Sequence, residues 1–264
     1  MKIGFIGCGN MGGTMMQAML DAGKCRPEEI MASDHSEELL RIRKEQTGVQ
    51  VTTDNRSVAA FAETLFLAVK PQYYETVIKE IRDLVTDGQL IVTIAPGKTL
   101  DWVAEIFGRE LKIIRTMPNA PAMVKAGMMA LCPNGRVSQE ELDAFRGLCG
   151  SFSNTEVVEE RLMDVVTAVG SSSPAYVFMF IEAMADAAVA EGMPRASAYK
   201  FASQAVLGSA KMVLDTGRHP GELKDMICSP GGTTIEAVRV LEEKGLRSAV
   251  FEAVKACAEK SRGL

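Results

Sequence analysis

Two glycine-rich segments carry the residue types that could hold a charged ligand. The first, Gly7-Cys8-Gly9-Asn10-Met11-Gly12, follows a short apolar run and matches the pattern G-x-G-x-x-G. In such a turn one glycine permits the bend, the second lets the backbone approach a pyrophosphate, and the third allows close packing of helix on strand. The free amides at the helix start then favour an anion. The pattern predicts a dinucleotide site at Gly7, Gly9, Asn10, Met11 and Gly12.

The second glycine-rich segment is Ser229-Pro230-Gly231-Gly232-Thr233-Thr234, which leads into a predicted helix. Its glycines expose backbone amides, and the helix start adds a positive partial charge, so the loop could cradle a carboxylate. An ordinary helix cap, in which Thr233 satisfies the unpaired amides, explains the same residues. From the loop alone the two interpretations are equally good.

The choice between NADH and NADPH should lie at the tip of the second predicted strand. Asp34 could accept a hydrogen bond from a ribose 2′-hydroxyl and favour NADH. Its neighbours could instead hold the 2′-phosphate of NADPH: Ser33, His35, Ser36 and the nearby Arg56. Both cofactors therefore stay open, and His35 alone is more commonly a solvated loop residue.

Three further strands end in small or rigid residues, in the segments Ala68-Val69-Lys70-Pro71-Gln72, Ile94-Ala95-Pro96-Gly97 and Thr116-Met117-Pro118-Asn119. In an open α/β sheet the ligand lies outside the carboxyl ends of the strands, so these segments should line the cofactor. Lys70 is the one charged residue among them. We expect it to make a polar contact with the nicotinamide half, although a loop lysine is usually just solvated.

The elements that must position these residues alternate between strand and helix in the first half of the chain. This rhythm predicts a doubly wound, mainly parallel Rossmann-type sheet. Helices with one apolar face are expected at 12–22, 37–46 and 72–84. Strands are expected at 2–6, 29–32, 64–69, 90–94 and 112–116, with weaker ones at 128–132 and 154–158.

The second half of the chain loses the strand pattern from about Leu162 and predicts an all-helical domain. We therefore expect a dinucleotide-binding domain at 1–160 and a helical substrate-binding and dimerisation domain at 161–264. One helix within 165–189 is apolar nearly all round, which favours packing between subunits. Further helices are expected at 196–216, 234–243 and 246–260.

Composition narrows the classes of function. Lys and Arg number 29 against 34 acidic residues, without a basic run, so no nucleic-acid partner is expected. The 6 cysteines show no metal-ligand spacing, which predicts free cytosolic thiols and no metal site. Glu182 and Asp186 interrupt the most apolar stretch, 175–190, and they are better explained as a polar strip than as metal ligands. With no export signal and no membrane span expected, the sequence predicts a cytoplasmic protein.

Six segments occur in an order that resembles the pyrroline-5-carboxylate reductase family. They are Gly7 to Gly12, Val69-Lys70-Pro71, Met117-Pro118-Asn119, Ser172-Ser173-Pro174-Ala175-Tyr176, 219–225 and Ser229 to Thr234. The resemblance covers nearly the whole chain, and Ser-Pro-Gly-Gly-x-Thr is its most specific part. It implies hydride transfer from NADPH, or NADH, to the imine carbon of pyrroline-5-carboxylate, giving proline. It also implies a homodimer whose helical domains interlock, often assembled into a larger ring such as a decamer.

The resemblance also implies roles for individual residues. Ser229, Gly231, Gly232 and Thr233 would hold the substrate carboxylate, while the Thr234 hydroxyl would reach the ring nitrogen as the catalytic group. In the nucleotide domain Ser33, Asn55 and the strand end Ala68 to Pro71 would contact the dinucleotide. Ala95 is expected to do so from its place at a strand end rather than from the resemblance. One departure is visible, because Gly170-Ser171-Ser172-Ser173 stands where many relatives have Ser-Gly-Ser-Gly or Ser-Gly-Ser-Ser.

Two other functions fit part of the sequence. A 3-hydroxyacid dehydrogenase shares the expected architecture but needs a positioned acid for its alkoxide, and no lysine follows Pro174 until Lys200. A non-catalytic nucleotide sensor would keep the first domain but have no use for the loop at 229–234. Measuring cofactor turnover separates these three functions. Turnover with the imine indicates the reductase, turnover only with hydroxyacids indicates the dehydrogenase, and binding without turnover indicates the sensor.

Overall fold

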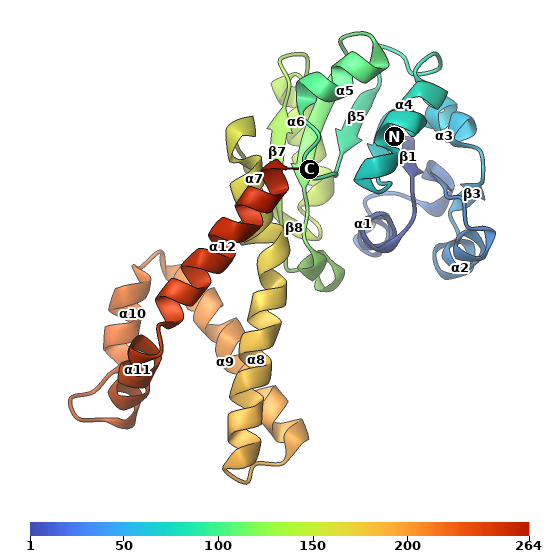
Figure 1. The fold of residues 1–264 in the computed structure, drawn as a ribbon. Helices are drawn as coiled ribbons and strands as arrows, with labels where there is room; N and C mark the ends of the chain where they lie inside the picture. The colour runs from blue at the N-terminus through green and yellow to red at the C-terminus, as the bar shows by residue number, and fades with distance from the viewer. Residues whose placement is uncertain (264) are drawn as a thin grey trace. The chain divides into compact units, whose positions relative to one another are not determined.

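A computed structural model describes residues 1–263, which form two compact units. The first unit comprises Met1–Ser172 and the residues from Cys257 onward, and the second comprises Ser173–Ala256. Figure 1 traces the chain through both units. Each unit is described below by itself.

The first unit is built on an 8-stranded sheet with the order β3-β2-β1-β4-β5-β6-β7-β8. All neighbouring pairs are parallel except β6 with β7. The seven strands predicted from sequence are confirmed with ends within two residues, whereas β3 was not predicted. The strands are β1 (Ile3–Ile6), β2 (Ile30–Ser33), β3 (Gln50–Thr52), β4 (Thr64–Leu67), β5 (Leu90–Thr93), β6 (Lys112–Met117), β7 (Gly127–Pro133) and β8 (Ser153–Val157).

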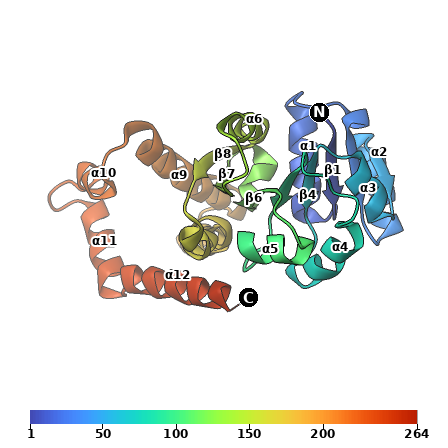
Figure 2. The same ribbon diagram turned by 90° about the horizontal axis from the view of Figure 1, so that it is seen from above.

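Helices cover both faces of this sheet, as Figure 2 shows from above. On one face α1 (Asn10–Asp21), α2 (Glu37–Thr47) and α6 (Gln139–Cys149) pack on a core that includes the stacked rings of Phe5 and Phe66. On the other face lie α3 (Asn55–Phe61), α4 (Tyr74–Ile81) and α5 (Leu100–Phe107). The doubly wound fold expected from the sequence is thereby confirmed.

Side-chain caps explain where several of these helices begin. The Ser36 hydroxyl accepts from the Leu39 N–H at 3.3 Å to start α2, and Ser138 forms a capping box with Glu141 to start α6. The expected helix at 72–84 is shorter than predicted. Its start is a 3₁₀ turn, Pro71–Tyr73, and α4 ends at Ile81.

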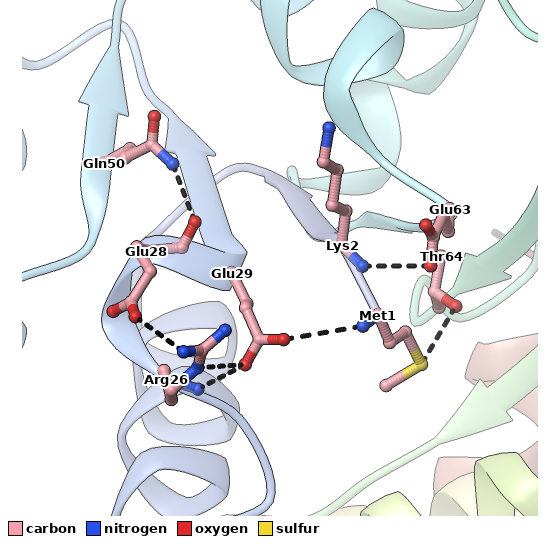
Figure 3. Close-up of polar contacts among 8 residues, drawn as sticks. All are labelled: Met1, Lys2, Arg26, Glu28, Glu29, Gln50, Glu63 and Thr64. Carbon is pink, nitrogen blue, oxygen red and sulfur yellow. Dashed lines mark hydrogen bonds and ion pairs between the residues drawn. The ribbon is translucent and has the colours of Figure 1, made fainter.

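The start of β1 is tied to its neighbours at the amino edge of the sheet (Figure 3). The Lys2 N–H donates to Glu63 Oε2 at 3.1 Å, just before β4. The amino group of Met1 lies 3.5 Å from Glu29 Oε1, just before β2, and Arg26 Nε lies 3.3 Å from the other oxygen of Glu29. These contacts hold β1 in register at the edge opposite its carboxyl end.

The end of the first unit is helical but irregular. A 3₁₀ turn (Glu160–Leu162) and α7 (Met163–Val166) lead into a π-helical turn at Thr167–Ser172. The helical run is continuous with α8, but the expected helix within 165–189 is not α-helical throughout.

The second unit is all-helical, as predicted. It contains α8 (Ser173–Ala190), α9 (Arg195–Thr216), α10 (Pro220–Ile227), α11 (Thr233–Glu243) and most of α12 (Leu246–Arg262). The helices α8 and α9 lie side by side (Figure 1). They pack through the small residues Ala185, Ala198 and Ala202. Ala185 is the one buried residue of α8.

Much of the apolar surface of α8 is exposed in this chain. Phe178 is 63% exposed and Met179 is 68% exposed. By length and composition alone the helical run at Glu160–Ala190 could cross a membrane, a test that core helices of soluble proteins also pass. Within the second unit, α8 therefore leaves much of its apolar surface exposed.

Candidate functional site

The nucleotide half of the candidate site lies at the carboxyl edge of the sheet, where the strand order changes direction between β1 and β4. Loops that leave adjacent strands at such a switch point diverge and open a crevice. Gly7 lies there with φ +98°, and a Cβ at this position would be 2.7 Å from the Ala68 carbonyl and 2.8 Å from the Val69 nitrogen. Only glycine fits between these two strand ends.

The other glycines of the fingerprint have different surroundings. A Cβ on Gly12 would lie 2.5 Å from the Gly7 oxygen, so the third glycine allows α1 to pack closely on the turn. A Cβ on Gly9 would meet nothing within 4 Å. Because α1 begins at Asn10 without a side-chain cap, its first amides remain available to an anion. The local geometry fits a bound pyrophosphate.

Asp34 braces this turn. Its Oδ2 accepts from the Cys8 N–H at 3.0 Å, and its Oδ1 accepts from the Ser36 N–H at 3.1 Å. Burial and the Asp34 carboxylate together raise the pKa of the Cys8 thiol to about 12. His35 is exposed, with its Nδ1 3.1 Å from Asp34 Oδ1. The Asp34 charge therefore lies beside the β1–α1 turn, where a bound dinucleotide would pass.

Ser33 and Asn55 meet beyond the carboxyl end of β2. The buried Ser33 hydroxyl donates to Asn55 Oδ1 at 2.7 Å, and Asn55 Nδ2 donates to Glu80 Oε2 at 2.8 Å. Arg56 Nη1 donates to the Glu80 carbonyl at 2.7 Å. The structure thus brings Ser33 and Asn55 together, while Arg56 points to Glu80. Contacts of these residues with a dinucleotide stay predictions.

The remaining strand-end residues differ in exposure. Lys70 is exposed beside the first turn of the next helix, whereas Ala68, Val69 and Pro71 are partly buried. Ala95 is buried, so it can offer a ligand its backbone but little side chain.

Sequence reasoning missed two residues that shape the crevice. Arg43 of α2 reaches the glycine turn, where Nε donates to the Cys8 carbonyl at 3.0 Å and Nη2 to the Gly9 carbonyl at 3.2 Å. The fully buried Tyr74 hydroxyl donates to the Leu67 carbonyl and accepts from the Ile94 N–H at 3.1 Å, joining the ends of β4 and β5. Burial raises the pKa of Tyr74. The sequence carries no local signal for either contact, because both partners are distant along the chain.

The substrate half of the candidate site, Ser229 to Thr234, lies in the second unit. Gly231 has φ +66°, and the Gly232 N–H donates to the Ser229 carbonyl at 3.1 Å to close the turn. Gly232 occupies the N-cap of α11 without a side-chain cap, and Thr233 is the first helical residue. Thr233 therefore does not cap the helix, and the amides at the start of α11 are free to bind a carboxylate.

The hydroxyls of this loop are also available. Within residues 1–263 the hydroxyls of Ser229, Thr233 and Thr234 make no hydrogen bond, and Thr234 is partly buried. In the same described range no group of three His, Cys, Asp or Glu side chains is placed to hold a metal ion. The chemistry this loop offers is neutral hydrogen-bond donation to a small anion.

Comparisons with known proteins match both halves of the chain. Residues 160–264 match a family model described as pyrroline-5-carboxylate reductase dimerisation. Residues 2–97 match a model described as NADP oxidoreductase, coenzyme F420-dependent. The nucleotide and substrate halves thus match separate models.

Individual relatives match along the full length. The pyrroline-5-carboxylate reductase of Escherichia coli (strain K12) is 52% identical, over 100% of this chain and 98% of that protein. A solved pyrroline-5-carboxylate reductase from Coxiella burnetii has a TM-score of 0.90 at 32% identity, covering 99% of this chain and 97% of that one. The Plasmodium falciparum pyrroline carboxylate reductase with NADP bound has a TM-score of 0.91 at 29% identity, with the same coverage of 99% and 97%.

Proposed function

The chain belongs to the pyrroline-5-carboxylate reductase family, and from that premise we propose how its residues carry out the reduction. It is an NAD(P)H-dependent oxidoreductase that converts pyrroline-5-carboxylate to proline by hydride transfer to the carbon–nitrogen double bond. The observation that carries the proposal is the loop Ser229 to Thr234. Its three hydroxyls are unpaired and the first amides of α11 are free, while the Gly232 N–H closes the turn.

In our proposal the nucleotide half holds the cofactor through its backbone. The open space at Gly9 and the uncapped amides at Asn10 and Met11 fit a pyrophosphate. Beyond them the cofactor is contacted by Ser33, Asp34, Asn55, Ala68, Val69, Lys70, Pro71 and Ala95. The reduced nicotinamide supplies the hydride when bound.

The substrate half then holds the imine. Ser229, Gly231, Gly232 and Thr233 bind its carboxylate, which the N-terminus of α11 stabilises. The Thr234 hydroxyl hydrogen-bonds the ring nitrogen and stabilises it as it becomes an amine. Such a reaction needs positioning more than an ionisable acid, because a protonated imine is already a good hydride acceptor.

The wider organisation is also a proposal. We assign residues 1–160 to the dinucleotide-binding domain and 161–264 to the substrate-binding and dimerisation domain, and the dimerisation match at 160–264 supports this division. We place the enzyme in the cytoplasm and propose that its dimers assemble further into a ring such as a decamer. The apolar surface that α8 leaves uncovered supports extensive contact between subunits.

Replacement of Thr234 tests the central assignment. We expect Thr234→Ala to lower kcat with pyrroline-5-carboxylate about 100-fold, the cost typical of losing one positioned donor. The dissociation constant for NADPH should not change, because only the contact to nitrogen is lost. Stopped-flow oxidation of NADPH measures the first quantity, and fluorescence titration measures the second.

The conservative variant Thr234→Ser is the matched control, since it keeps the hydroxyl and should retain most activity. Wild-type kcat in Thr234→Ala would remove this residue from its proposed role. Turnover of hydroxyacids but not of the imine would favour a dehydrogenase, and tight cofactor binding without any turnover would favour a nucleotide sensor.

A further inference from the structure

The helical run that ends the first unit widens into a π-turn at Thr167–Ser172 for a reason that its sequence explains. Pro174 has no N–H, so the Gly170 carbonyl cannot receive the usual helical hydrogen bond from four residues ahead. The proline ring would also collide with that carbonyl in a regular α-helix. Widening of the helix relieves the collision and leaves the Gly170 oxygen in need of a donor.

Asn119, which follows β6, supplies that donor. Its Nδ2 donates to the Gly170 carbonyl at 3.0 Å, while its Oδ1 accepts from the Met128 N–H at 2.9 Å at the start of β7. The Asn119 side chain is buried, so both ends of its amide are used in holding two strands and the π-turn together.

A second hydrogen bond runs in the opposite direction, from Ser171 in the π-turn to the segment that follows β6. The Ser171 hydroxyl donates to the Pro118 carbonyl at 2.8 Å. We name this pair of bonds, Asn119 to Gly170 and Ser171 to Pro118, the π-turn clasp. A Cβ on Gly170 would lie 3.9 Å from Val166, an ordinary contact, so glycine is not required there. The specific feature of the turn is the Ser171 hydroxyl.

The π-turn clasp holds the end of β6, which lies at the edge of the sheet where we expect the cofactor to bind. Pro118 directly follows β6, and β6 ends at the same carboxyl edge as β1, β4 and β5. The pyrophosphate anchor after β1 is three strands away in the order β1-β4-β5-β6. A change at Pro118 should therefore disturb the nicotinamide half of the crevice and leave the anchor of the cofactor intact.

We propose that Ser171 is a positioning residue for hydride transfer, which acts through the Pro118 carbonyl to hold the end of β6 against the bound nicotinamide. The inference rests on the function proposed above. Hydride transfer depends steeply on the distance between donor and acceptor, so a small displacement of this strand end slows the chemical step more than it weakens binding.

Three variants test the inference in the full-length enzyme. Ser171→Ala removes the hydroxyl, Ser171→Thr keeps it, and Ser151→Ala is the matched control. Ser151 is also partly buried and donates to a carbonyl at 2.9 Å, but its partner, Leu148, is only three residues away at the end of α6. The measurements are kcat, the NADPH dissociation constant, the melting temperature, and the primary isotope effect with NADPH deuterated at the transferred position.

For Ser171→Ala we expect kcat to fall about tenfold, with the isotope effect raised and the NADPH dissociation constant unchanged. Ser171→Thr should restore kcat, and Ser151→Ala should match the wild type. A merely structural role would lower the melting temperature without raising the isotope effect, and that result would overturn the inference. Wild-type kcat in Ser171→Ala, or an equal fall in Ser151→Ala, would do the same. A wild-type enzyme that does not reduce the imine would instead contradict the proposed function.

Discussion

At the scale of single residues, we expect the Asp34 carboxylate to influence the choice between NADPH and NADH. It lies beside the glycine turn, with side-chain exposure of only 10%, so solvent screens it weakly. A 2′-phosphate near it would meet a like charge, whereas a 2′-hydroxyl could donate to it. We expect Asp34→Asn to raise the ratio of kcat/KM for NADPH over NADH about tenfold.

Steady-state kinetics with both cofactors measures this ratio. Asparagine keeps an oxygen that can accept from the Cys8 N–H, so the turn should survive the loss of charge. Asp54→Asn is the control, because it also removes one carboxylate, but from an exposed residue that caps α3. An unchanged ratio in Asp34→Asn would mean that this carboxylate does not set the preference.

The residues recognised from the sequence were those whose role depends on neighbours close along the chain. Gly7 and Gly12 could be recognised because the spacing of the fingerprint itself encodes the bend and the close packing. Arg43 and Tyr74 could not be recognised, and Asn119 was predicted only as part of a strand end that lines the cofactor. Each of the three reaches a backbone group more than four residues away along the chain. Side chains that support a site through such contacts carry no signature in spacing or composition.

At the scale of elements, Tyr74 connects two strand ends that line the crevice. Its hydroxyl serves both the Leu67 carbonyl and the Ile94 N–H in a fully buried position. Tyr74→Phe would leave that N–H and that carbonyl without a partner and should lower the free energy of unfolding by about 1–3 kcal/mol. Urea denaturation followed by circular dichroism measures the change.

The adjacent Tyr73 provides the matched control. It is 53% exposed, so Tyr73→Phe should leave the free energy of unfolding unchanged within about 0.5 kcal/mol. Equal stability of the two variants would show that the buried hydroxyl does not join β4 to β5 in solution.

The elements that sequence predicted best are those with continuous apolar patterns. The central strands are buried on both faces and read as apolar runs, so β4 and β5 were located to within two residues. By contrast β3 is three residues long, is not buried, and has no such run. The π-turn was missed because Pro174 shows only that a helical bond is lost, while its replacement comes from Asn119, 51 residues before Gly170.

At the scale of the whole molecule, the helices of the second unit expose several large apolar side chains. Large side chains that are more than half exposed lie on four of them: Phe178 and Met179 on α8, Phe201 and Leu207 on α9, Met226 and Ile227 on α10, and Phe251 on α12. A membrane is a poor cover for α8, because Glu182 and Asp186 would each cost about 2.5–3.5 kcal/mol near the bilayer centre. The match of residues 160–264 to a dimerisation model instead supports a second copy of the chain as the cover.

Phe178→Glu should therefore separate the subunits. The variant loses the favourable burial of the Phe178 ring. It also places a carboxylate in an apolar interface, where its desolvation is not offset by a partner. Together the two effects should cost several kcal/mol per copy. Sedimentation velocity in detergent-free buffer should show the wild type as a dimer or a ring of dimers and the variant as a smaller species. The imine reductase activity should fall in parallel, since each site is expected to take residues from both subunits. Met123→Glu, at a residue 72% exposed in the first unit, should keep the wild-type mass. A wild type that sediments as a monomer, or that stays in solution only with detergent, would contradict the subunit interface at α8.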